Sequence, residues 1–262
     1  MTTQEMIERL ADNELRLYIR DLEVENESLK KRLDINADKV KRGSRAHTIY
    51  KLADGTRVPG TTTITGQADK SGVLVPWANK LGLEGIDSSK YTDNAAKIGT
   101  LAHAMVQAHL QKTELDLREF SPNEVDLAEN ALISFFEWEK QHEIEVIACE
   151  QRFVSDRLKY GGTIDCYCKL DGVPTLLDFK TGKAIYDEYF MQLAAYKNLI
   201  EEQGLPVDNC QILRIGRDET EGFEVRAVAD TRTDFAMFQD LLSFYYHKKE
   251  KTAASKAKKG AK

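Results

Sequence analysis

The chain has 262 residues, of which 42% are hydrophobic, enough to build one large domain or two small ones around a core. No run of residues is long and apolar enough to span a membrane, and the first residues lack a signal-peptide pattern, so the sequence predicts a cytoplasmic protein without membrane contact. A net charge of −6 disfavours simple electrostatic binding to nucleic acid over the whole surface.

Residues 1–42 have the pattern of an amphipathic helix. Leu15, Leu22 and Leu29 recur every seven residues, and Asn26 occupies the complementary heptad position. A single Asn at that position favours a parallel dimer with a fixed register. The pattern therefore predicts either a short coiled coil that makes a homodimer or higher oligomer, or a helix that packs on the rest of its own chain.

Residues 44–246 form the next predicted domain, after a polar linker. A hairpin is expected around Asp54-Gly55, and the threonine-rich stretch 59–65 could bind a terminal phosphate as a loop. Trp77 follows on an expected helix, where an aromatic residue is more often part of the core than a platform for a base.

A helix is predicted over residues 92–111. Thr92 is the expected N-cap, and an apolar stripe runs from Ala95 to Leu110 along one face. His103 lies one turn after Gly99, and that glycine would allow another backbone to approach closely. His103 is therefore a candidate ligand, although a lone histidine at a helix edge is more often hydrogen-bonded into the core.

A further amphipathic helix over 122–142 precedes a predicted strand over 145–155. Alternation along this strand places Glu150 on one face with Val146, Ala148 and Arg152. Glu150 could bind a metal, orient a water or pair with a lysine of the site, or it could pair with Arg152 and have no chemical role.

The most informative segment is a predicted hairpin, in which Gly161-Gly162-Thr163-Ile164-Asp165 leads into a strand and Asp171-Gly172 forms the turn. The returning strand ends in Asp178-Phe179-Lys180. Alternation places Asp178 and Lys180 on one face, and the hairpin can bring Asp165 near Asp178.

Two carboxylates at this spacing would repel each other unless a cation lies between them. Mg²⁺ and Mn²⁺ prefer such oxygen ligands, and they can polarise a phosphoryl oxygen and acidify a water. A lysine beside them would stabilise the negative charge that develops on a phosphate. Asp165, Asp178 and Lys180 together therefore indicate phosphodiester hydrolysis, whereas an isolated Asp-x-Lys would be an ordinary surface pair.

The remaining elements are a helix over 184–203, strands over 208–217 and 222–230, and a helix over 231–249. They predict an α/β fold with a central sheet that has helices on both sides. Residues 247–262 contain seven lysines and one glutamate, which gives this tail a charge of +6 and the rest of the chain −12. The tail is predicted to be disordered, and it serves either as a DNA-tethering arm or as a solvated tail.

In order along the chain, five motifs resemble those of the PD-(D/E)XK nuclease superfamily, in particular its RecB-like, phage-type exonuclease branch. They comprise the Gly99–His103 segment, Glu150, Asp165, Asp178-Phe179-Lys180 and the Gln-x-x-x-Tyr motif of Gln192 and Tyr196. The resemblance covers roughly residues 44–246, and one departure is Asp178 at a position where that branch commonly has Glu.

The resemblance implies a restriction-endonuclease-like core with a mixed sheet. It implies that Asp165 and Asp178 bind one or two Mg²⁺ or Mn²⁺ ions with help from His103, and that Lys180 and Glu150 join them in catalysis. Gln192 and Tyr196 would support the site and contact the nucleic-acid backbone. Thr181 and Lys183, directly after the second strand, are assigned to DNA binding with them.

The sequence therefore predicts a metal-dependent deoxyribonuclease, an exonuclease in preference to an endonuclease, acting in DNA recombination, repair or replication. Its expected partners are linear duplex or single-stranded DNA ends and a recombination protein. The alternative is a non-catalytic DNA-binding or assembly protein on a nuclease fold.

Some relatives carry an iron–sulfur cluster, but here the four cysteines lie on predicted core strands. They are expected to be free thiols, and no iron–sulfur cluster is predicted.

Overall fold

A five-stranded mixed sheet forms the centre of the protein in the computed structural model, which describes residues 48–217 and 221–260. The strands lie in chain order: β3 (Ile144–Ser155), β4 (Tyr160–Leu170), β5 (Val173–Lys180), β6 (Asn209–Ile215) and β7 (Phe223–Ala227). Only β5 and β6 pair in parallel, and α7 (Asp187–Glu201) connects them. The predicted α/β fold with a mixed sheet is confirmed.

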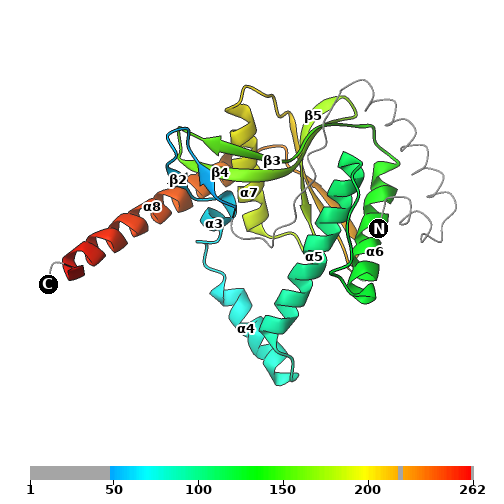
Figure 1. The fold of residues 1–262 in the computed structure, drawn as a ribbon, viewed down its shortest axis with the longest axis horizontal. Coiled ribbons are helices and arrows are strands. Elements are labelled where there is room, and N and C mark those ends of the chain that lie inside the picture. The colour runs from blue at the N-terminus through cyan, green and yellow to red at the C-terminus, as the bar shows by residue number, and fades with distance from the viewer. Residues whose placement is uncertain (1–47, 218–220, 261–262) are drawn as a thin grey trace.

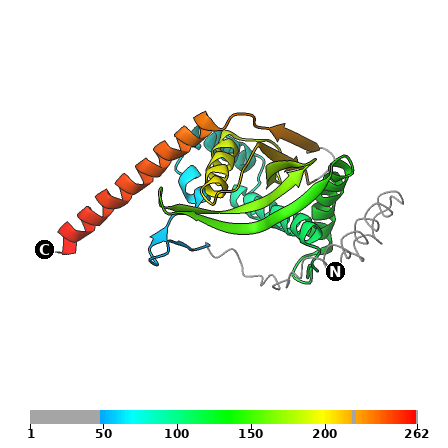
Figure 2. The ribbon, with the colours of Figure 1, turned by 90° about the horizontal axis from the view of Figure 1, so that it is seen from above.

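Helices cover both faces of this sheet (Figures 1 and 2). On one face, α5 (Ser88–Gln111) and α6 (Pro122–Glu139) bury an apolar cluster that includes Leu177 and Phe179 of β5. On the other face, α3 (Thr61–Thr65), α7 and α8 (Arg232–Gly260) bury a second cluster, which includes Ile164 and Leu176. Because β5 is covered on both sides, a charged residue in its middle is removed from water.

Both predicted hairpin turns are present. Asp171 and Gly172 have φ angles of 51° and 80°, as a two-residue turn between right-twisted strands requires, and β4 and β5 pair as predicted. The smaller hairpin joins β1 (Tyr50–Lys51) to β2 (Arg57–Val58), with Gly55 at a φ of 84°. Local turn chemistry alone is therefore sufficient to place these two reversals.

The start of α5 differs from the prediction. Asp87 is the N-cap, and its side chain accepts hydrogen bonds from the backbone N–H groups of Ser89 and Lys90. Thr92 lies one turn inside the helix, where its hydroxyl donates to the carbonyl of Ser88. Asp and Thr are both favourable N-cap residues, and in this helix Asp87 accepts the hydrogen bonds from the free N–H groups of the first turn.

The faces of β3 and β4 also differ from strict alternation. Val146 packs in the α5/α6 cluster and Ala148 in the α7/α8 cluster, because the register shifts between them at a β-bulge. On β4, strict alternation would place Ile164 and Cys166 on the same face, but Ile164 lies in the second cluster and Cys166 in the first. The change of face falls at Asp165, between these two residues.

The threonine-rich stretch 59–65, which was expected to be a loop, forms the short helix α3, whereas the helix expected around Trp77 is present. In α3, Thr61 and Thr65 are buried, and the Thr61 hydroxyl donates to the Gly161 carbonyl at 3.0 Å, so these two threonines serve packing. Thr62 and Thr63 are exposed, and phosphate binding by this stretch stays a prediction. The next helix, α4 (Ser71–Leu83), buries none of its residues and projects from the body (Figure 1). Trp77 is thus not a core residue; its ring packs at 6.0 Å from Tyr91.

The last helix, α8, continues to Gly260, through the lysine-rich segment that was predicted to be disordered. Its second half extends away from the sheet (Figures 1 and 2). The predicted coiled coil over residues 1–42 lies outside the described residues. Within the part of the chain that the structure covers, no helix is both long and apolar enough to cross a membrane.

Candidate active site

The two aspartates of the hairpin lie where β4 and β5 separate. Cys166 and Leu177 are the last residues paired in the direction of the site, and Asp165 and Asp178 follow them on their strands. The Asp165 carboxylate accepts a hydrogen bond from the backbone N–H of Phe179 at 2.8 Å. This bond takes the place of a ladder bond and fixes Asp165 beside the end of β5.

Asp178 is fully buried, and Lys180 is its close partner. The Lys180 Nζ lies 2.5 Å from Asp178 Oδ2, and the lysine side chain is 14% exposed. Oδ2 is buried, and the Lys180 ammonium is its ion-pair partner. The other oxygen, Oδ1, accepts a long hydrogen bond of 3.4 Å from Gln192 Nε2.

Burial raises the pKa of Asp178 to about 6, because a carboxylate loses its hydration inside the protein. The Lys180 ammonium opposes this rise in pKa, and the neighbouring Asp165 carboxylate adds to it. A carboxylate held at such a cost, beside a second one, is a pattern found at functional sites.

His103 faces this pair from α5. Its Nδ1 lies 3.9 Å from Asp165 Oδ1, and its ring stands edge-on to Phe179 at 6.3 Å. Gly99, one turn earlier, lies against Thr181, since a Cβ atom built at Gly99 would be 2.3 Å from the threonine Oγ1. The glycine thus lets α5 approach the end of β5, although the neighbour is the Thr181 side chain and not the backbone that the sequence predicted.

Glu150 has an unusual backbone in the middle of β3. Its φ is 51°, and the pairs Cys149–Cys166 and Gln151–Ile164 on either side place it across from Asp165 in the register. A left-handed glutamate within a strand costs about 1–3 kcal/mol and is typical of functional sites. Its side chain is exposed. The backbone of Glu150 therefore lies opposite that of Asp165, and the chemical role of the Glu150 side chain stays a prediction.

Gln192 and Tyr196 lie one turn apart on α7, as predicted. Gln192 Nε2 donates to the Tyr196 hydroxyl at 2.9 Å, which aims the amide at Asp178. The Tyr196 ring is buried, and burial raises its pKa well above the usual value. Tyr196 can therefore act through Gln192. Because its ring is buried, it does not face outward to contact the nucleic-acid backbone, as the resemblance implied.

The paired glycines before Asp165 make room for two tyrosines. A Cβ atom at Gly162 would lie 2.5 Å from the Tyr196 ring, and one at Gly161 would lie 2.5 Å from the Tyr50 ring. The Tyr50 hydroxyl is also within 2.9 Å of Thr163 Oγ1. The Gly-Gly-Thr segment thus lets the rings of Tyr50 and Tyr196 pack directly against the strand that carries Asp165.

Thr181 and Lys183 follow Asp178 and Lys180 at the edge of the sheet. Thr181 is half-buried against α5, whereas Lys183 is exposed, with its Nζ 5.9 Å from the centre of the Tyr91 ring. Lys180 Nζ lies 5.0 Å from the Tyr189 ring. Sequence reasoning missed Tyr189, although its position three residues before Gln192 on a predicted helix already put it on the face toward the site.

Within the described ranges, no group of three or more His, Cys, Asp or Glu side chains is arranged to hold a metal ion by itself. Asp165 and Asp178 are the carboxylates that the site offers, and their oxygens are the ligands that a hard divalent cation prefers. Two protein oxygens fit Mg²⁺ in particular, because this ion keeps several of its waters. The residues present therefore fit a divalent ion that is shared with water and substrate.

The four cysteines are free thiols in this structure, and Cys166, Cys168 and Cys210 are buried. Cys149 lies opposite Cys166 across β3 and β4. All four cysteines lie on strands of the central sheet, as the sequence indicated.

No protein-family model matches the chain, and no curated protein matches its sequence. Among solved structures, the alkaline exonuclease LHK-Exo from Laribacter hongkongensis is similar in two crystal structures. The complex with dAMP aligns with 61% of this chain and 83% of its own, at 11% identity and a TM-score of 0.38. The second aligns with 64% of this chain and 90% of its own, at 11% identity and a TM-score of 0.37.

A protein of Eubacterium rectale, described provisionally as an exonuclease, aligns with 72% of this chain and 70% of its own, at 14% identity and a TM-score of 0.37. The chain thus resembles PD-(D/E)XK nucleases in motif order and alkaline exonucleases, distantly, in structure.

Proposed function

We propose that the chain is a metal-dependent deoxyribonuclease that hydrolyses phosphodiester bonds from DNA ends. The observation that supports this most strongly is the fully buried Asp178, ion-paired with Lys180 and next to Asp165 at the open end of the hairpin. A purely structural core would gain from an apolar residue at position 178, since an ion pair in the interior rarely adds net stability.

In this proposal Asp165 and Asp178 hold Mg²⁺ or Mn²⁺. A bound ion of this kind would polarise the phosphoryl oxygen and acidify the attacking water. Lys180 positions that water and stabilises the charge that develops on the phosphate. Gln192 keeps Asp178 oriented, and His103, beside Asp165 on α5, assists the two aspartates in holding the ion.

The outer residues of the site have supporting roles. Lys183 and Thr181 bind the phosphates that flank the cleaved bond, and Glu150 acts on the water or the ion from β3. The choice of an exonuclease of the recombination or repair type rests on the resemblance of the motif order to the RecB-like branch. The alternative is a non-catalytic DNA-binding or assembly protein, which would keep the fold but not need the Asp178–Lys180 pair.

The test is digestion of end-labelled linear duplex and single-stranded DNA by the full chain with Mg²⁺ or Mn²⁺. We expect shortened products that are absent in EDTA, and a ladder from the labelled end would reveal the exonuclease mode and its polarity. Intact DNA with both metals and both substrates would overturn the proposal.

Matched variants assign the residues. Asp178→Asn and Lys180→Met should each reduce cleavage by at least about 1,000-fold, since each removes a group that the transition state needs. Asp171→Asn, the same change at the turn of the same hairpin, and Lys169→Met, an exposed lysine on β4, should retain activity. Normal cleavage by either site variant would refute the assignment.

A further inference from the structure

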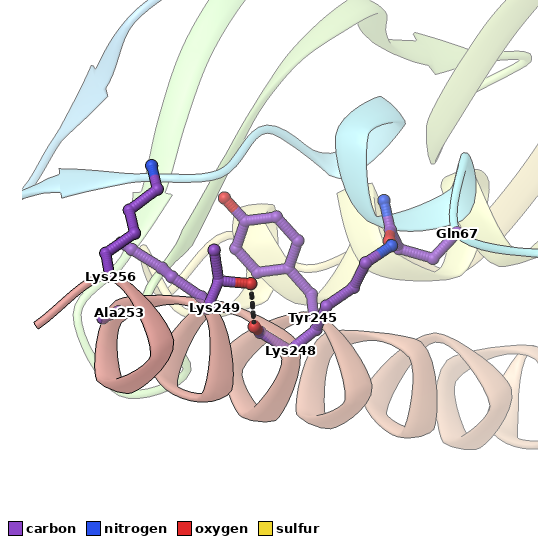
Figure 3. Close-up of a pocket in the computed structure, with 7 residues that line it drawn as sticks. Gln67, Tyr245, Lys248, Lys249, Ala253 and Lys256 are labelled. Atoms are coloured by element: carbon purple, nitrogen blue, oxygen red, sulfur yellow. Dashed lines mark hydrogen bonds between the residues drawn. The ribbon is translucent and has the colours of Figure 1, made fainter. Parts of the chain in front are cut away.

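A groove lies along the second half of α8, beside the segment that follows α3. Its volume is about 450 Å³. Figure 3 shows Tyr245, Lys248 and Lys256 rising from one side of α8 toward α3 and the small hairpin. The residues that line it recur every three or four positions along α8 and include one from the α3 side: Gln67, Tyr245, Lys248, Lys249, Thr252, Ala253 and Lys256.

The groove concentrates positive charge on an otherwise acidic chain. Among the residues that the structure describes, no carboxylate forms an ion pair with Lys248, Lys249 or Lys256. Lys248 Nζ lies 3.5 Å from the Gln67 side-chain oxygen and 5.7 Å from the centre of the Phe244 ring, and Lys249 Nζ lies 5.9 Å from that of Tyr246. Residues 1–246 carry a charge of −12, and residues 247–262 carry +6. Phosphates are therefore repelled by most of the chain and attracted to this end of α8.

The spacing of the lysines fits a strand of nucleic acid. Lys248 and Lys256 are eight residues apart, or about 12 Å along the helix axis, a length over which one strand presents about three phosphates. Tyr245 adds an aromatic ring at one end of the groove. A lysine-lined groove combined with an aromatic side chain is the arrangement by which proteins bind single strands without regard to sequence.

The groove is linked to the candidate active site through α3. Thr61 at the start of α3 donates to the Gly161 carbonyl and lies against Gly162, which also contacts Tyr196. Tyr196 in turn holds Gln192 beside Asp178. The helices α3, α7 and α8 cover the same face of the sheet, so a bound strand can extend from the groove toward the site without crossing the sheet.

We propose that this groove binds the phosphate backbone of a single DNA strand outside the active site. The proposal rests on the proposed deoxyribonuclease function for the identity of its ligand. The three lysines compensate for the acidic body and keep the strand on the protein while its end is at the site.

The experiment measures binding of fluorescein-labelled oligo(dT) to the full chain in EDTA, where no cleavage interferes, over a range of salt concentrations. Replacing Lys248, Lys249 and Lys256 together by Gln should reduce the slope of log Kd against log salt by about 2 and weaken binding about 100-fold at 0.1 M salt. A single Lys256→Gln change should weaken it about fivefold.

Lys251→Gln is the matched control, because it removes the same charge from the same helix at a position that does not line the groove. It should change the affinity less than twofold. All four lysines are exposed, so thermal melting should show unchanged stability. The proposal that the groove binds DNA would be refuted if Lys251→Gln weakened binding as much as Lys256→Gln, or if the triple variant bound as tightly as the wild type.

Failure of the groove and failure of the nuclease proposal give different results. If the triple variant binds normally while the wild type digests DNA, only the groove is refuted. If the triple variant loses binding while the wild type leaves DNA intact with both metals, the nuclease proposal fails and the groove stands. An equal loss of affinity for blunt duplex and for oligo(dT) would refute the preference for a single strand.

Discussion

Replacing Asp178 by Asn should stabilise the metal-free protein while it abolishes cleavage. Burial raises the pKa of this carboxyl from 3.8 to about 6. Between these values the folded protein keeps a proton that the unfolded chain has released, so stability is lost as the pH rises through this range. At pH 7.5 the ionised side chain therefore costs roughly 3 kcal/mol relative to its protonated form.

An asparagine has nearly the shape of the protonated acid and carries no charge. The attraction of Lys180 is already contained in the pKa of about 6, so it does not reverse the sign. We expect Asp178→Asn to gain up to about 3 kcal/mol in the free energy of unfolding at pH 7.5, and about 1 kcal/mol at pH 4.5, where the folded wild type is mostly protonated.

Urea unfolding in EDTA at the two pH values measures both gains, with Asp171→Asn as the opposite case. The Glu143 N–H and His142 lower the pKa of the Asp171 carboxyl, so this substitution should stabilise the protein at neither pH. Adding Mg²⁺ at pH 7.5 should raise the unfolding midpoint of the wild type and of Asp171→Asn, but not that of Asp178→Asn. A variant less stable than wild type at pH 7.5, or a gain that is equal at both pH values, would show that desolvation does not dominate at this residue.

Three further predictions concern the surroundings of the site. Glu150→Gly should stabilise the protein by about 1 kcal/mol in urea unfolding, because glycine tolerates the φ of 51°; Glu150→Gln should not, and a less stable glycine variant would argue against strain. Gly162→Ala should destabilise by about 1–3 kcal/mol, because its Cβ meets the Tyr196 ring, whereas Gly82→Ala, with open space around it, should not; equal midpoints would contradict the close packing. Tyr196→Phe should keep the fold and lower the cleavage rate about tenfold, because Gln192 loses the hydroxyl that holds it; an unchanged rate would leave the tyrosine a packing role only.

The sequence by itself was sufficient for features that depend on local chemistry. Asp171-Gly172 specifies a tight turn whatever surrounds it, and alternation along a short strand places Asp178 and Lys180 on one face. The apolar periodicity of the helices and strands likewise determined a sheet with helices on both sides. These signals act over a few residues, so no knowledge of distant contacts was needed.

Tertiary structure decided where alternation fails. The β-bulge in β3 and the change of face at Asp165 depend on how β3 and β4 pair, and no pattern within either strand shows them. The burial of Tyr196, and of Thr61 in the stretch expected to be a phosphate-binding loop, depends on packing against the glycines of β4.

Asp165, Asp178 and Lys180 could be named from the sequence, but their environment could not. Complete burial of Asp178, its long contact with Gln192 and its raised pKa arise because α7 covers the end of β5. In the same way, the lysines at the end of the chain were visible as a charge excess, while the groove they line required α8 to stay helical beside α3. Residue type is local information, whereas desolvation and the grouping of charges depend on segments that are distant in the sequence.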